Sequence, residues 1–274
     1  MKASKKTLLT FLLTATALTS APAALLYDLN TAVVTGGGQN TFAAATGSAG
    51  GAGGSFTGSL PTNLVFTDGG TNTFDYFIGK FSTSTLTTVG DTLSLNFTAT
   101  GANFSTLTGQ SIRFGLFNVG TATTGAGSTF NAATGYRADY GPANNPGPGA
   151  IRERNNTADN LFSSGVSPNL TSNSVPFTFN PNGTYSGSLT LELLAGSQVK
   201  ITSQIGGTTA VSVTDTTAAF TNFNSFGFFL TDNGSPASLS FTNLTVTSVP
   251  EPGTVALLGL AGMAFLLRRR KSVR

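Results

Sequence analysis

Apolar and polar residues alternate with a period of two along much of the chain between residues 25 and 249. In DTLSLNFTAT (91–100), Leu93, Leu95 and Phe97 alternate with Ser, Thr and Asn. Successive side chains of a strand point to opposite faces, so this pattern predicts a strand with one buried and one polar face. Similar alternation marks SIRFGLFN (111–118), GSLTLELL (187–194), QVKITSQI (198–205), NSFGFFL (224–230) and SLSFTNLTVTSV (238–249). Many short strands of this kind predict an all-β antiparallel sandwich.

Turn residues between these segments predict hairpins and one irregularity. Residues 194–197 contain a glycine and join two of the alternating runs, and Gly206 and Gly207 mark a tight turn after the second run. In the last run the apolar phase shifts, which predicts a β-bulge near Asn243.

Two segments interrupt the strand pattern. Residues 35–59 are rich in Gly, Ala, Ser and Thr, and residues 120–156 contain the cluster GPANNPGPG. The first is predicted to be a flexible loop or a long connection, and the second a long surface loop.

The composition excludes several classes of chemistry. The 274 residues include no Cys, no His and no Trp, and 9% are charged. Without Cys there is no thiol nucleophile, disulfide or iron–sulfur site, and without His the commonest general base and transition-metal ligand are missing. We therefore predict no catalytic residue and expect a protein that is not an enzyme.

The first 23 residues have the features of a secretory signal peptide. Three lysines precede the apolar residues 7–18, and Ala21 and Ala23 flank a proline in the small-x-small pattern of a cleavage site. We expect residues 1–23 to be removed on export, which leaves a domain at residues 24–249. An amphipathic first helix of the fold is the alternative.

The charge of the domain differs from that of the whole chain. The chain has a net charge of +3, but eight of its fourteen basic residues lie near the two termini, and the domain between them is mildly acidic. It has no basic stripe of the kind that binds nucleic acid, so no nucleic-acid partner is predicted.

The C-terminal residues combine three elements in order. Pro250, Glu251 and Pro252 come first, and an apolar run of 14 residues, 254–267, follows. As a helix that run spans about 21 Å, against a hydrocarbon core of roughly 30 Å, so we expect a short or transient transmembrane helix. A basic cluster ends the element: Arg268, Arg269, Arg270 and Lys271. This cluster would stay cytoplasmic. A buried core helix is the alternative.

This tail, residues 250–274, resembles the PEP-CTERM sorting signal of exopolysaccharide-producing Gram-negative bacteria, which the membrane protease exosortase recognises. The resemblance implies export, temporary retention in the inner membrane, and cleavage near Pro250 to Pro252. Release or transfer to the cell surface or extracellular matrix would follow. The partners that it implies are exosortase and, transiently, the inner membrane.

The domain more loosely resembles the concanavalin-like jelly rolls that such exported proteins often carry, in blocks such as IRFGLFN, GYRADY and FGFFLTDNG. Fold resemblance alone does not give the function. Our first hypothesis is a non-catalytic surface or matrix protein that binds glycans of the exopolysaccharide through the loop edge of the sandwich, where polar loops can donate hydrogen bonds to sugars. The candidate patch consists of Tyr136, Arg137, Asp139 and Tyr140. The alternative for these residues is a strand whose tyrosines pack.

The competing function is a glycoside hydrolase or lyase on the same fold, which needs a pair of carboxylates. Glu192 has no second acid nearby on its strand, and Glu153 lies between Arg152 and Arg154, which are expected to keep it ionised on a salt-bridged surface. No metal-binding residue is assigned. The oxygen-rich turns at Asp68 and at 232–233 leave a structural Ca²⁺ open, and no other cofactor is predicted.

Overall fold

The computed structural model describes residues 22–31, 41–46, 55–57, 64–67, 75–103, 111–122, 130, 132–141, 149–155, 161–162, 169–172, 177, 180, 182–207, 211–231 and 237–251. Residues Ala23 to Glu251 belong to one compact unit. The predicted signal peptide up to residue 21 and the apolar tail from residue 252 lie outside the described residues. Within the described residues, no helix has the length and apolar character needed to cross a membrane.

Eight strands form one sheet, called sheet A, in the order β13-β12-β11-β6-β15-β4-β3, with β1 also paired to β15. The bounds are β1 (Ala24–Asp28), β3 (Ser55–Thr57), β4 (Leu64–Thr67), β6 (Thr92–Ala102), β11 (Thr184–Leu194), β12 (Gln198–Ile205), β13 (Val211–Asp215) and β15 (Ser238–Val249). Two short 3₁₀ helices, η1 (Leu29–Thr31) and η3 (Ala195–Ser197), follow β1 and β11.

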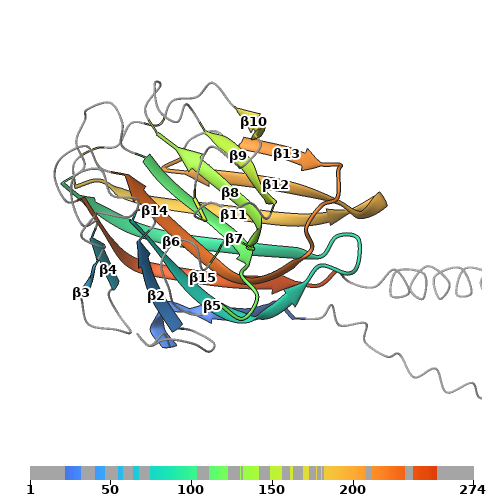
Figure 1. Ribbon diagram of the computed structural model, residues 1–274, viewed down its shortest axis with the longest axis horizontal. Coiled ribbons are helices and arrows are strands. Elements are labelled where there is room, and N and C mark those ends of the chain that lie inside the picture. The colour runs from blue at the N-terminus through green and yellow to red at the C-terminus, as the bar shows by residue number, and fades with distance from the viewer. Residues whose placement is uncertain are drawn as a thin grey trace, which may run out of the picture. The chain divides into compact units, whose positions relative to one another are not determined.

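Seven strands form the second sheet, called sheet B, in the order β10-β9-β8-β7-β14-β5-β2. The bounds are β2 (Thr41–Thr46), β5 (Asp75–Thr85), β7 (Ser111–Asn118), β8 (Thr134–Tyr140), β9 (Ala150–Asn155), β10 (Asn169–Ser172) and β14 (Asn222–Thr231). All strand pairs in both sheets are antiparallel. Figure 1 shows the two sheets stacked as layers, which confirms the predicted all-β antiparallel sandwich.

Phenylalanine rings fill the space between the sheets. The ring of Phe228 on β14 lies 4.9 Å from that of Phe97 on β6 and 4.8 Å from that of Phe241 on β15, measured between centroids. It also stacks on Phe77 of β5 at 5.2 Å. All of these side chains are almost completely buried. Aromatic contacts at such distances add to the burial of apolar surface, so this cluster is a main source of stability.

The predicted connections on sheet A are confirmed. Strands β11 and β12 form a hairpin through η3, where Gly196 adopts a positive φ of 75°. Strand β13 returns along β12 after Gly206 and Gly207. The register between β15 and β6 shifts between Phe241 and Asn243, where the sequence predicted a bulge. The shift keeps Phe241 and Leu244 on the buried face.

Both long loops predicted from composition were wrong in part. Strands β8 and β9 lie within residues 120–156, and their pairing places them inside sheet B. Strands β2 and β3 lie within residues 35–59, each at the end of its sheet. Strand pairing uses backbone N–H and C=O groups, so a segment with few large apolar residues can still extend a sheet edge.

The face of sheet B that points away from sheet A is also buried. Tyr76, Phe117 and Phe229 pack there with Phe130 and Phe162, which come from outside the strands. Phe162 stacks on Phe229 with centroids 5.5 Å apart. Sheet B is therefore covered on both faces over this region, which explains why β7 is buried at seven of its eight positions.

Candidate functional site

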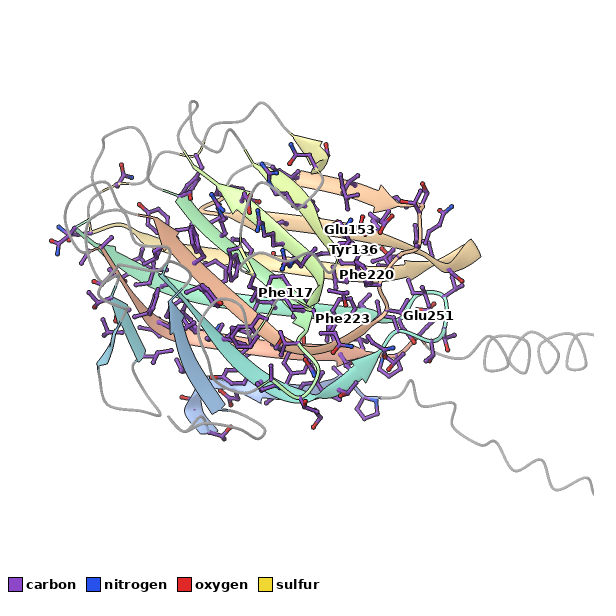
Figure 2. All side chains as sticks on the ribbon, viewed as in Figure 1. Phe117, Tyr136, Glu153, Phe220, Phe223 and Glu251 are labelled. Atoms are coloured by element: carbon purple, nitrogen blue, oxygen red, sulfur yellow. The ribbon has the colours of Figure 1, made fainter. Side chains whose placement is uncertain are left out.

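The end of the last strand is held against a turn of the domain. Strand β15 ends at Val249, and the backbone N–H of Glu251 donates a hydrogen bond of 3.0 Å to Asp91 Oδ1. A Cβ on Gly90 would lie 2.5 Å from Glu251 Oε2, so the glycine leaves room for the glutamate. Glu251 itself is exposed at the end of the sandwich (Figure 2).

Asp91 organises this turn between β5 and β6. Its Oδ2 atom accepts hydrogen bonds of 2.8 Å from the backbone N–H groups of Thr87 and Thr88. Burial by itself raises the pKa of Asp91, but the hydrogen bonds from Thr88, Glu251 and Thr87 outweigh it and lower the pKa. The carboxylate therefore stays ionised and binds the turn and the first residues of the tail together.

Strand alternation divides the predicted sugar-binding patch between two faces of sheet B. Tyr136 and Tyr140 point into the core between the sheets, whereas Arg137 and Asp139 point to the opposite face. The exposed fraction is at most 2% for each of the four residues. A role in binding sugar remains a prediction for them, but their burial argues against direct contact with a polymer. The alternative of a strand with packed tyrosines agrees with this placement.

The two tyrosine hydroxyls each have a polar partner within the core. Tyr140 donates a hydrogen bond of 3.0 Å to Ser203 Oγ. Burial raises the pKa of Tyr140 to about 12 and that of Tyr136 still further. Both hydroxyls therefore stay protonated at physiological pH and act as hydrogen-bond donors.

Three arginines surround one buried carboxylate on the covered face of sheet B. Asp139 lies 2.9 Å from Arg137 Nε, 2.8 Å from Arg152 Nε and 3.9 Å from Arg113 Nε. Arg113 also donates to the carbonyl of Phe162 and lies over the ring of Phe229, 4.6 Å from its centroid. These contacts attach the Leu161–Phe162 segment to the sheet.

Burial acts on Arg137 without removing its charge. It lowers the pKa of Arg137 to about 10, and the charge of Asp139 opposes that decrease. The guanidinium therefore keeps its charge at neutral pH. This face has the features of a structural ion-pair network, because its members bind one another and the covering segment.

Glu153 lies on the opposite face from its neighbouring arginines. Its partner across the β8–β9 pair is Tyr136, so it points into the space between the sheets, while Arg152 pairs with Arg137 on the other face. The expectation that Arg152 and Arg154 hold Glu153 ionised on a salt-bridged surface was therefore wrong. Burial, and then the charge of Asp215, raise the pKa of Glu153.

Asp215 brings a second carboxylate from sheet A to the same place. Tyr136 donates a hydrogen bond of 2.7 Å to Asp215 Oδ2 and accepts one of 2.9 Å from the backbone N–H of Phe220. Asp215 Oδ1 accepts hydrogen bonds from the backbone N–H and the hydroxyl of Thr217. Figure 2 labels Glu153, Tyr136 and Phe220 in this region.

The remaining candidate residues from the sequence lie either on an exposed face of sheet A or outside the described residues. Glu192 on β11 lies on the outer face of sheet A and forms an ion pair of 3.5 Å with Lys200, with both side chains well exposed. The turns at Asp68 and 232–233, the basic cluster 268–271 and the cleavage site at Ala21 lie outside the described residues. Among the described residues, no three His, Cys, Asp or Glu side chains gather as a metal site.

The C-terminal residues show which sorting signal the protein carries. Residues 248–271 match the model of the PEP-CTERM protein-sorting motif. The chain ends in a PEP-CTERM sorting motif. The motif begins within the last residues of β15, and Glu251, which donates to Asp91, is its central acid. No curated protein matches the sequence.

Similar solved structures are sandwich proteins of low sequence identity. The metal-free Emp46p carbohydrate recognition domain has a TM-score of 0.48 and 15% identity over 70% of this chain and 85% of that one. Peanut lectin has a TM-score of 0.45 and 11% identity over 84% and 98%. The PL-14 alginate lyase from Aplysia kurodai has a TM-score of 0.39 and 16% identity over 70% and 86%. The likeness is loose, and the assignment of the fold depends on the two antiparallel sheets themselves.

Proposed function

We propose that this chain is an exported protein that exosortase sorts through its C-terminal motif and delivers to the cell surface or extracellular matrix of a Gram-negative-type bacterium. The observation that carries the proposal is the sorting motif at residues 248–271. It starts where the last strand of the sandwich ends, and its Glu251 is exposed and hydrogen-bonded to the folded domain. The inner membrane holds the chain only until the tail is cleaved.

The test follows the tail in a host that has exosortase. Mass spectrometry of the wild-type protein should find a mature C-terminus near residues 250–252. Replacement of Pro250, Glu251 and Pro252 by alanine should leave the tail attached, and so should deletion of the exosortase. Glu192→Gln on the outer face of sheet A is the control and should be processed normally. A secreted wild-type protein that keeps residues 253–274 would contradict the proposal.

The second part of the proposal concerns the domain itself, which we infer to be non-catalytic and to bind an uncharged polysaccharide. Its support is the outer face of sheet A, where hydroxyl groups pair across neighbouring strands at 2.9 to 3.2 Å: Ser94 with Thr190, Thr98 with Ser186, Thr100 with Thr184, and Thr202 with Ser212. Among the described residues of β6, β11, β12 and β13, the charges on this face are the paired Glu192 and Lys200. A flat face of hydroxyls offers many hydrogen bonds to a neutral polymer.

A hydrolase or lyase has less support. Glu192 is paired with Lys200, and two facing carboxylates of the described residues, Glu153 and Asp215, lie between the sheets with exposed fractions of 9% and 1%. A sugar polymer needs both carboxylates on an open cleft.

Retention of the full chain on polysaccharide columns tests the binding. Wild type should be retained by a neutral polymer such as agarose or dextran. Thr98→Arg and Thr190→Arg place bulky charges on the hydroxyl face and should abolish retention, whereas Val89→Arg in the exposed β5–β6 turn should not. Retention that survives both face variants, or no retention on any polymer, would refute the binding surface. Release of reducing sugars by the wild type would refute the non-catalytic assignment.

A further inference from the structure

Two carboxylates from different sheets face each other beside a tyrosine at one edge of the sandwich. Strand β13 at the end of sheet A lies against β9 and β10 of sheet B. This contact brings Asp215 of β13 to Tyr136 and Glu153, which are partners in the β8–β9 register. The three side chains come from three strands, so their meeting depends on how the two sheets close.

Glu153 has no favourable partner among the described residues. Its exposed fraction is 9%, and among the described residues its carboxylate takes part in no hydrogen bond or ion pair. Its electrostatic contacts are with the carboxylate of Asp215 and the hydroxyl of Tyr136, and its charge acts unfavourably on both. A largely buried carboxylate without a counter-charge is unfavourable.

The nearby cations of the fold are directed elsewhere. Arg113, Arg137 and Arg152 surround Asp139 on the opposite face of sheet B. Lys200 lies on the outer face of sheet A, where it pairs with Glu192. Within the described part of the chain, no ion pair joins Glu153 or Asp215 to a cation, so the two carboxylates have a formal charge of −2.

We propose that Glu153 and Asp215 bind a divalent, oxygen-preferring cation, Ca²⁺, between the edges of the two sheets. The donors suit this ion because Ca²⁺ takes carboxylate oxygens and water in flexible geometry, and its charge equals that of the two carboxylates. Thr217 holds Asp215 Oδ1, and Tyr136 holds Oδ2 from one side, so the carboxylate is already oriented. Glu153 would supply the second carboxylate, and water would complete the shell.

Bound Ca²⁺ would join strands of the two sheets at this edge. The ligands lie on β9 and β13, and Tyr136 extends the site to β8. Extracellular Ca²⁺ modules have Kd values of 10⁻⁴ to 10⁻³ M, a suitable range for a chain that works outside the cell. The proposal does not depend on exosortase or on sugar binding.

Thermal unfolding of the full chain, stripped with EDTA and then titrated with CaCl₂, tests the site. At about 100 times Kd the Tm should rise by about 5–10 °C, and Mg²⁺ should have less effect. Glu153→Gln and Asp215→Asn should each lose the Ca²⁺-dependent shift, whereas Glu192→Gln, an exposed carboxylate on β11, should keep it.

Terbium luminescence gives a second measurement that does not depend on stability. Tb³⁺ replaces Ca²⁺ at oxygen sites, and a tyrosine beside it sensitises its emission. Wild type should show this emission, Ca²⁺ should displace it, and Tyr136→Phe should reduce it strongly.

Three results would overturn the proposal. One is no Ca²⁺-dependent shift and no terbium emission in wild type. The second is a shift that Glu153→Gln retains but Asp232→Asn loses, which would place the ion at the 232–233 turn. The third is stabilisation by acid alone, which would mean that a proton neutralises the pair. If either carboxylate variant fails to fold, the wild-type terbium titration and Tyr136→Phe still decide between these outcomes.

Discussion

Replacing Asp139 by Asn should strongly destabilise the domain, because it removes the carboxylate at the centre of three arginines. Asp139 and Arg137 are fully buried, and the distances from the carboxylate to Arg137 Nε and Arg152 Nε are 2.9 and 2.8 Å. Asparagine keeps the size of the side chain but removes its charge. Three guanidinium groups would then repel one another on a face from which Leu161 and Phe162 exclude water.

The expected magnitude follows from the burial of the network. Breaking a buried ion pair by removing one partner costs about 3–5 kcal/mol. For a domain of this size, 1 kcal/mol shifts the Tm by roughly 2–4 °C, so Asp139→Asn should lower the Tm by about 6–20 °C. We expect a decrease in Tm near the upper end of this range because three cations share the single carboxylate.

Chemical denaturation of the full chain measures this effect. The midpoint for Asp139→Asn should fall with an unchanged m-value, since the surface exposed on unfolding stays the same. The control is Glu192→Gln, which breaks a pair of the same kind at 3.5 Å on the exposed face of sheet A. It should cost at most about 1 kcal/mol. A loss below about 1 kcal/mol for Asp139→Asn would refute the view that this carboxylate neutralises the arginines.

Three further substitutions test other parts of the structure. Phe228→Ala should lower the free energy of unfolding, measured by chemical denaturation, by about 3–5 kcal/mol because it leaves a cavity among the core rings. Its control is Leu25→Ala, which changes a 57% exposed side chain and should have little effect. Gly79→Ala should cost about 1–3 kcal/mol by the same measurement, since its Cβ would overlap the ring of Phe226; equal stability would show that the ring can move aside. Asp91→Asn should destabilise the domain at pH 7 and progressively less below about pH 4. Because the pKa of Asp91 is lower in the folded state, its ionised carboxylate stabilises the fold at any pH above the pKa of the unfolded chain. This stabilisation is lost as the pH falls through the pKa of Asp91 in the folded state. A stability difference between variant and wild type that does not change with pH would contradict this.

The central strands were predictable because their two faces meet different surroundings. Leu93, Leu95 and Phe97 of β6 face the core while the residues between them face outward, and the alternation in the sequence records this difference. The bulge before Asn243 could be located for the same reason, because the apolar phase has to shift if both halves of β15 are to stay buried.

Strand β9 was missed, and β8 was predicted only as the alternative to a sugar-binding patch, because both faces of these strands are buried. Tyr136 faces the aromatic core and Arg137 faces a covered ion-pair network, so the residues do not separate into apolar and polar sets. The Gly- and Pro-rich cluster between the strands then suggested a loop. The orientation of Glu153 was available from the sequence once a strand was recognised, since adjacent residues of a strand point to opposite faces.

The sequence alone determined the alternating strands, the absence of Cys and His chemistry, and the sorting motif, because each depends on the type and order of nearby residues. Only the tertiary structure decided that Asp91 holds Glu251, that Asp139 neutralises three arginines, and that Glu153 meets Asp215. These contacts join residues up to 160 positions apart. Their formation depends on the order of strands within each sheet and on the way the sheets close, and local residue patterns do not encode either.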